Sequence, residues 1–298
     1  MLLLAPSEIL NYGIAYIGLT KHVKRWNPKR QELEFHKHYG SSSSVISSMW
    51  VDLSIHSNLK KSEEGEKGFK QFMVAMHFVW AKPKNASILA STMGVSVDSA
   101  CGETVWKWIR RMEDLKAIKI DGDFECDEIF GISGDGIDFK LWERKHPIFN
   151  IDRKACSHKF KACAAKYLIG LSMQKAKCVF IAGPYPGGVG DSTIMEHSGL
   201  QDLLLKHNKV AMLDRGFKTE NVQHRATHCY PDEIDPPDLH LFKSRARLHQ
   251  ETFNRRLRCF SILCHTFTHG WDKHGSAFAA VVVIVQYQMD LGSPIFAV

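Results

Sequence analysis

The sequence predicts an α/β fold in which helices flank a mixed sheet and a helical region precedes the sheet. The first observation is a set of strand-like segments, at 124–141, 167–173, 178–182 and 210–213. The second is helical spacing of apolar residues in 68–118 and in segments at about 192–206, 244–267 and 275–289. Strands in series, followed by helix, strand and helices, favour a mixed sheet with helices on its faces.

The N-terminal part is divided into two regions. Residues 1–66 are interpreted as a loosely constrained arm, because a basic cluster at 21–30, the serine run Ser41–Ser44 and a charged stretch interrupt its apolar segments. Residues 67–120 are predicted to be helical and to break at Gly94, which lies four residues after a small Ala. This pattern occurs in helix-turn-helix units that read DNA, and also in ordinary helical hairpins.

Bulk composition limits the class of protein. The net charge of +7 suits a polyanionic partner, although many other proteins share such an excess. The eight cysteines form no CxxC pair and are expected to be reduced, mostly buried thiols of an intracellular protein. The longest apolar run, 277–285, is far shorter than the ~20 residues that a helix needs to cross a bilayer, so no membrane partner is expected.

Three carboxylates stand out by their placement within residues 121–298. Asp135 lies between two glycines on or just after a strand, Asp214 ends a short apolar strand, and Glu251 lies within a helix. Functional groups in open α/β sheets gather at the carboxyl ends of strands, so we expect these acids to converge. Such a cluster needs a cation, and Mg²⁺ prefers carboxylate and water oxygens. An Asp beside a Gly is more often only a turn residue.

Cations surround Glu251, which is the single acidic residue between positions 243 and 258. Helical spacing places Phe253, Leu257, Phe260 and Cys264 on one face and Glu251, Arg255 and Arg258 on the opposite face. The apolar face is expected to pack on the sheet, and Glu251 and Arg255 form a favourable i,i+4 pair. A salt-bridged surface helix would show the same pattern. The candidate phosphate-binding cations are Lys243, Arg245, Arg247, Arg255, Arg256 and Arg258.

Several motifs follow one another in a characteristic order, at 134–139, 157–159, 183–192, 213–217 and 245–257. As an ensemble they resemble the motifs of DDE transposases of the Harbinger and related insertion-sequence type. The resemblance covers about 86–298. Gly134–Phe139 is similar to the first-Asp motif, Leu213–Phe217 to the second-Asp motif, and Arg245–Leu257 to the third-acid helix.

This resemblance implies an RNase H-like catalytic domain at 121–298, with Asp135, Asp214 and Glu251 as the metal-binding and catalytic triad. It implies Mg²⁺ or Mn²⁺ as cofactor, with two ions, and double-stranded DNA, both transposon ends and target, as substrate. The reaction would be phosphodiester cleavage followed by strand transfer. By analogy, paired-end cutting suggests a homo-oligomer, and an accessory DNA-binding protein is a further possible partner. Localisation to the nucleus is expected, with the 21–30 cluster as an import signal or a DNA-contacting arm, or to the cytoplasm in a prokaryote.

Alternatives stay open at this point. Asp138 is close enough to Asp135 to compete for the first acidic position, and Asp191 competes for the second. The chain could be a domesticated, catalytically silent DNA-binding protein on the same fold, or a cellular nuclease without transposition. The pairs His224/His228 and His265/His269 have helical i,i+4 spacing, but neither completes a zinc pattern.

Overall fold

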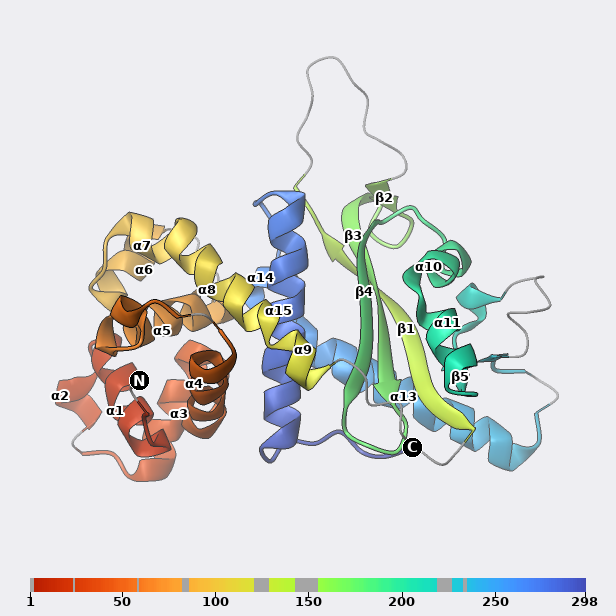
Figure 1. Ribbon diagram of the computed structural model, residues 1–298, viewed down its shortest axis with the longest axis horizontal. Coiled ribbons are helices and arrows are strands. Elements are labelled where there is room, and N and C mark those ends of the chain that lie inside the picture. The colour runs from red at the N-terminus through yellow and green to blue at the C-terminus, as the bar shows by residue number, and fades with distance from the viewer. Residues whose placement is uncertain are drawn as a thin grey trace, which may run out of the picture. The chain divides into compact units, whose positions relative to one another are not determined.

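The computed structural model describes residues 3–23, 25–57, 59–81, 86–120, 129–142, 155–218, 227–232 and 235–298. The chain forms two compact units (Figure 1). The first, here called the helical unit, comprises Met1–Lys119, Cys259–Ile262 and Ser276–Ser293. The second, the sheet unit, comprises Ile120–Arg258, Leu263–Gly275 and Pro294–Val298.

The helical unit is built around buried aromatic side chains. The ring of Trp50 lies 5.2 Å from that of Phe69, 5.7 Å from Phe72 and 5.8 Å from Trp108, measured between centroids. The elements of this unit are α1 (Pro6–Tyr16), α2 (Thr20–Val23), α3 (Pro28–Tyr39), α4 (Ser43–His56), η1 (Lys61–Glu63), α5 (Glu66–Ala81), α6 (Ala86–Met93), α7 (Val97–Cys101), α8 (Glu103–Asp114), α9 (Lys116–Lys119) and most of α15 (Trp271–Asp290).

Within residues 1–66, the described part of the chain forms helices with buried side chains, whereas the sequence suggested a loosely constrained arm. Phe35 and Trp50 are fully buried, on α3 and α4 respectively. The serine run is part of a helix start: the Ser42 hydroxyl accepts a hydrogen bond from the Val45 backbone N–H and caps α4. A run of serines suggests a flexible break, but an N-cap position favours the same residue type.

The helices predicted within 68–118 are present, with one additional break. Gly94 adopts a φ of 59° after α6, as expected of a turn glycine. The predicted helix from 98 to 115 is divided at Gly102 into α7 and α8, where a Cβ atom would lie 2.5 Å from the Asp98 carbonyl oxygen. DNA reading by the α6–α7 segment stays a prediction.

The sheet unit contains the mixed sheet that the sequence predicted (Figure 1). Its strands run in the order β4-β3-β1-β5-β6, and β2 pairs with the start of β3. β1, β3 and β4 are antiparallel neighbours, whereas β5 is parallel to both β1 and β6. The two-residue β6 was not predicted, and positions 124–128 of the predicted first strand lie outside the described residues. The strands are β1 (Phe130–Lys140), β2 (Cys156–Ser157), β3 (Ala162–Ser172), β4 (Cys178–Pro186), β5 (Val210–Leu213) and β6 (His228–Cys229).

Helices cover both faces of this sheet (Figure 1). On one face, Ala211 and Leu213 of β5 pack in a cluster with α10 (Asp191–Ser198), α11 (Leu200–Lys206) and the short η3 (Arg215–Phe217). On the other face, Met212 packs against Ala246 of α13 (Pro237–Arg258). The alternation along β5 is the period of two that places successive side chains on opposite faces of a strand.

Two helices predicted as continuous are interrupted in the structure. The helix predicted at 192–206 is divided at Gly199, which has a φ of 79°. The helix predicted at 244–267 ends at Arg258, and Cys264 belongs to the separate short α14 (Ser261–Cys264). Phe260 and Cys264 therefore do not extend the apolar face of α13, although Phe253 and Leu257 are buried on it as predicted.

Two predictions from bulk composition can be compared with the described residues. Among the described residues, no helix has the length and apolar character that a membrane crossing requires. The apolar run 277–285 lies buried within α15. The cysteines within the described residues are free, as expected. Among them only Cys178 is buried, so the expectation of mostly buried thiols is wrong for this part of the chain.

Candidate active site

The parallel pairing of β1 and β5 places two of the predicted acids side by side. Gly134 of β1 is in register with Leu213 of β5, and the next residues along the two strands are Asp135 and Asp214. Asp214 follows the last residue of β5 and caps η3, because its Oδ1 accepts a hydrogen bond from the Arg215 backbone N–H at 2.8 Å. Asp135 lies within β1, so only Asp214 occupies a strand end.

Helix α13 brings Glu251 to the same region. Two buried amides dock this helix on the sheet: Ser133 Oγ donates to Gln250 Oε1 at 3.1 Å, and Asn254 Nδ2 donates to Asp135 Oδ2 at 2.7 Å. Glu251 lies between these two contacts in sequence. The predicted acids thus come from β1, from the end of β5 and from a helix packed across them.

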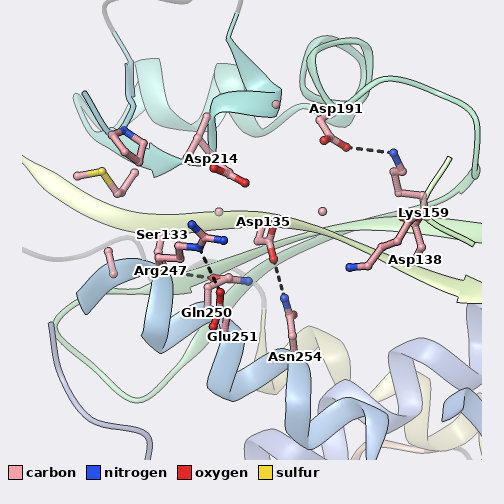
Figure 2. Close-up of a pocket in the computed structure, with 18 of the residues that line it drawn as sticks. Ser133, Asp135, Asp138, Lys159, Asp191, Asp214, Arg247, Gln250, Glu251 and Asn254 are labelled. Carbon is pink, nitrogen blue, oxygen red and sulfur yellow. Dashed lines mark hydrogen bonds and ion pairs between the residues drawn. The ribbon is translucent and has the colours of Figure 1, made fainter. Parts of the chain in front are cut away.

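Asp135, Asp214 and Glu251 line one pocket of about 970 Å³, which lies within the sheet unit. Asp138 and Asp191 line it as well. Figure 2 shows these carboxylates around the pocket, with Asn254 pointing toward Asp135. The structure therefore brings the predicted triad to a single cavity and also leaves both competing acids within it.

The electrostatic state of Asp135 reflects this crowding. The pKa of its carboxyl group is raised from 3.8 to about 6, chiefly by burial and in addition by the charges of Asp214 and Asp191. Hydrogen bonds from the Gly136 backbone N–H and from Asn254 act in the opposite direction. An ionised carboxylate is thus unfavourable here unless a cation offsets the burial and the neighbouring negative charges.

Glu251 is the least constrained of the three acids. Its side chain is 57% exposed and accepts a hydrogen bond from Arg247 Nε at 3.1 Å, across one helical turn. The predicted partner was Arg255, four residues later, but the structure records the pair with Arg247, four residues earlier. An exposed i,i+4 pair contributes only about 0.3–0.5 kcal/mol, so it holds Glu251 weakly. Among the residues that the structure describes, no group of three or more His, Cys, Asp or Glu side chains is arranged to hold a metal ion.

The two competing acids are already engaged with other groups. Asp138 is buried, and its carboxylate accepts a hydrogen bond from the Ser157 hydroxyl. Asp191 forms an ion pair with Lys166 at 3.1 Å. Its carboxylate fills a notch between two glycines, since Cβ atoms at Gly136 and Gly216 would lie 3.1 Å and 2.7 Å from its oxygens.

The six candidate phosphate-binding cations separate into three groups. Lys243 is buried, and its ammonium group donates to Asp235 and to the Tyr230 carbonyl, so it is a structural cation. Arg245 and Arg256 donate to the carbonyl oxygens of Ala297 and Pro294, in the C-terminal segment. The candidates that line the pocket, apart from Lys243, are Arg247, Arg255 and Arg258.

Sequence reasoning missed the polar residues that dock α13. Gln250 and Asn254 lie four residues apart, which places both on one helical face, beside the buried Phe253 and Leu257. Amides adjacent to an apolar stripe were the available signal. The pocket is further lined by basic side chains that the sequence did not single out as ligands, namely His158, Lys159 and Lys166.

The histidine pairs do not form a second site in the part of the chain that the structure describes. α14 ends at Cys264, so His265 and His269 do not share a helix, contrary to the expected spacing. His224 lies outside the described residues, and the His228 ring contacts the Tyr230 hydroxyl at 2.9 Å.

One family of known proteins matches the segment that contains this pocket's acids. The family model of the DDE superfamily endonucleases matches residues 135–286, slightly more than half of the chain. The matched segment begins at Asp135 and contains Asp214 and Glu251. Comparison with curated proteins and with solved structures gives no match. The mixed sheet with helices on both faces is consistent with the RNase H-like fold of this family. The chain belongs to the DDE superfamily endonucleases.

Proposed function

We propose that this protein is a metal-dependent DNA endonuclease and strand transferase, a transposase, in which Asp135, Asp214 and Glu251 form the catalytic triad. One observation carries the proposal. Three acids from β1, the end of β5 and α13 line a single pocket, inside the segment that matches the endonuclease family. A family match alone would not select these acids among the many in the chain.

The residues present fit a divalent cation such as Mg²⁺ or Mn²⁺. Asp135 and Asp214 are adjacent hard oxygen donors, and the raised pKa of Asp135 reflects burial and negative charge that a cation would offset. Glu251 would join them by leaving its exposed pair with Arg247. The chemistry that two such ions supply is activation of the attacking water or 3′-hydroxyl and stabilisation of the leaving oxygen.

The other residues of the pocket would bind the substrate. Arg247, Arg255 and Arg258 line the pocket from α13 and would hold phosphates on both sides of the scissile bond. Arg247 has a double role in this proposal, because binding a phosphate would release Glu251 from its ion pair. The substrate is double-stranded DNA at transposon ends and targets. Action as a homo-oligomer, help from an accessory DNA-binding protein and localisation in the nucleus are part of the same proposal.

A second candidate is a catalytically silent DNA-binding protein on this fold. Two observations favour it. Glu251 is paired with Arg247, and among the described side chains no group of three or more His, Cys, Asp or Glu residues is arranged to hold a metal ion. Such a protein would bind DNA through the same arginines and would not cut it in the presence of any divalent cation.

Nicking of supercoiled plasmid in Mg²⁺ or Mn²⁺ tests the proposal. The wild-type protein is expected to nick, and Asp214→Asn and Glu251→Gln are each expected to fall to background, since each removes a proposed cation ligand. Matched controls are Asp202→Asn and Glu196→Gln, which change exposed residues of α11 and α10 that do not line the pocket. Cleavage that survives both triad substitutions would refute the triad, and DNA binding without cleavage by the wild type would favour the silent protein.

A further inference from the structure

Two buried amides on one face of α13 meet two side chains on one face of β1. Gln250 and Asn254 are four residues apart on the helix, a rise of about 6 Å. Their partners Ser133 and Asp135 are two residues apart on the strand, a rise of about 6.6 Å. Because the two spacings match, both hydrogen bonds form at once, at 3.1 Å and 2.7 Å.

The two amides differ in how well the fold satisfies them. Both ends of Gln250 are engaged, since Oε1 accepts from Ser133 and Nε2 donates to the Ile169 carbonyl at 3.4 Å. Asn254 donates to Asp135, but its Oδ1 is buried and has no hydrogen-bond partner among the described residues. An unsatisfied buried acceptor lowers the stability of the folded state. Gln250 is therefore well suited to docking the helix, whereas Asn254 is a poor choice for that purpose alone.

What Asn254 does provide is orientation of a proposed catalytic carboxylate. It holds Oδ2 of Asp135, and the Gly136 backbone N–H donates to the same carboxyl group. Asn254 follows Glu251 by three residues on α13. The helix that carries the third acid, Glu251, therefore also donates a hydrogen bond to the first acid, Asp135. Figure 2 shows the Asn254 amide directed at Asp135 from α13.

We propose that Asn254 is a positioning residue, which fixes the Asp135 carboxylate for cation binding, while Gln250 docks α13 on β1. This inference rests on the proposed function. Residues that orient a metal-binding side chain typically change metal affinity by about 10–100-fold when they are replaced.

A pair of shape-conserving variants separates positioning from docking. Asn254→Leu removes the donor to Asp135 and the unsatisfied Oδ1, and it keeps the number of heavy atoms and the branch at Cγ. It is expected to change the melting temperature little, because the loss of the donor to Asp135 and the removal of the unsatisfied Oδ1 act in opposite directions. It is expected to weaken Mn²⁺ binding to the DNA-free protein by about 10–100-fold, measured by electron paramagnetic resonance. Gln250→Met removes the hydrogen bonds to the Ser133 hydroxyl and to the Ile169 carbonyl. It is expected to lower the melting temperature with little change in Mn²⁺ affinity.

An Asn254→Leu protein with wild-type Mn²⁺ affinity would overturn the proposal, whatever its stability. If the leucine variant does not fold, Asn254→Ala is measured instead, and the same loss of Mn²⁺ affinity is expected. If the wild type binds no Mn²⁺, the proposed function fails, and crystal structures then decide the orientation separately. The Asp135 carboxylate must change its rotamer when Asn254 is replaced; an unchanged rotamer would contradict the inference.

Discussion

The Asp135→Asn protein is expected to lose nicking activity and, in EDTA at pH 8, to be more stable than the wild type by up to about 3 kcal/mol. The pKa of Asp135 is raised from 3.8 to about 6, first of all by burial. A raised carboxyl pKa favours the folded state below pH 3.8, and this contribution is lost as the pH rises through 6. Each tenfold change in the acid dissociation constant corresponds to about 1.4 kcal/mol. Asparagine has the same shape, does not ionise and can still accept the hydrogen bond from Asn254.

Urea unfolding of both proteins at pH 4 and pH 8 measures this difference in the free energy of unfolding. The two proteins should be nearly equal at pH 4 and diverge at pH 8, and Mg²⁺ at pH 8 should stabilise the wild type more than the variant. The exposed substitution Asp202→Asn on α11 is the matched control, for which little change is expected. An Asp135→Asn protein that is less stable than the wild type at pH 8 would show that the ionised carboxylate of Asp135 does not destabilise the folded state.

Replacing Arg247, Arg255 and Arg258 together with glutamine is expected to weaken DNA binding and to reduce its salt dependence. If each arginine contacts one phosphate, the slope of log affinity against log salt should become less steep by about 3. These side chains line the pocket beside the proposed triad. The matched control is the Arg245→Gln, Arg256→Gln protein, because these arginines lie on the same helix but donate to backbone carbonyls of the C-terminal segment.

Fluorescence anisotropy with a short duplex between about 50 and 200 mM salt measures both slopes. The triple variant should bind with the shallower slope, and the double variant should keep the wild-type slope even if its stability falls. Equal slopes for the wild type and the triple variant would remove these arginines from the DNA interface. A shallower slope for the double variant alone would place the interface on the opposite side of α13.

Much of the sheet unit was predictable because local pattern and tertiary structure agree there. The apolar run at 210–213 ends at Asp214 in the sequence, and β5 ends at Leu213 in the structure. The spacing of Phe253 and Leu257 likewise identified the buried face of α13. The convergence of Asp135 and Asp214 was expected from a general property of strand ends, but Asp135 lies within β1. The two acids are adjacent because β1 pairs with β5, which no local pattern specifies.

The charged residues of α13 show where sequence reasoning stops. Helical spacing allows Glu251 two arginine partners, one turn before and one turn after, and only the side-chain conformation selects Arg247. Lys243 carries the same formal charge as its neighbours, yet Asp235 neutralises it in a buried ion pair. Asn254 lies beside the apolar stripe of α13, but its proposed role depends on a contact with Asp135, more than a hundred positions away.

The location of bound Mn²⁺ tests the central claim most directly. In crystals of the protein soaked with Mn²⁺, alone and with a short DNA duplex, anomalous scattering locates each ion. The proposal predicts an ion at about 2.0–2.2 Å from carboxylate oxygens of Asp135 and Asp214. With DNA present, Glu251 should have left Arg247 and joined the ligands. Ions bound elsewhere in the pocket, for example by Asp191 or Asp138 without Asp135 and Asp214, would contradict the assigned triad.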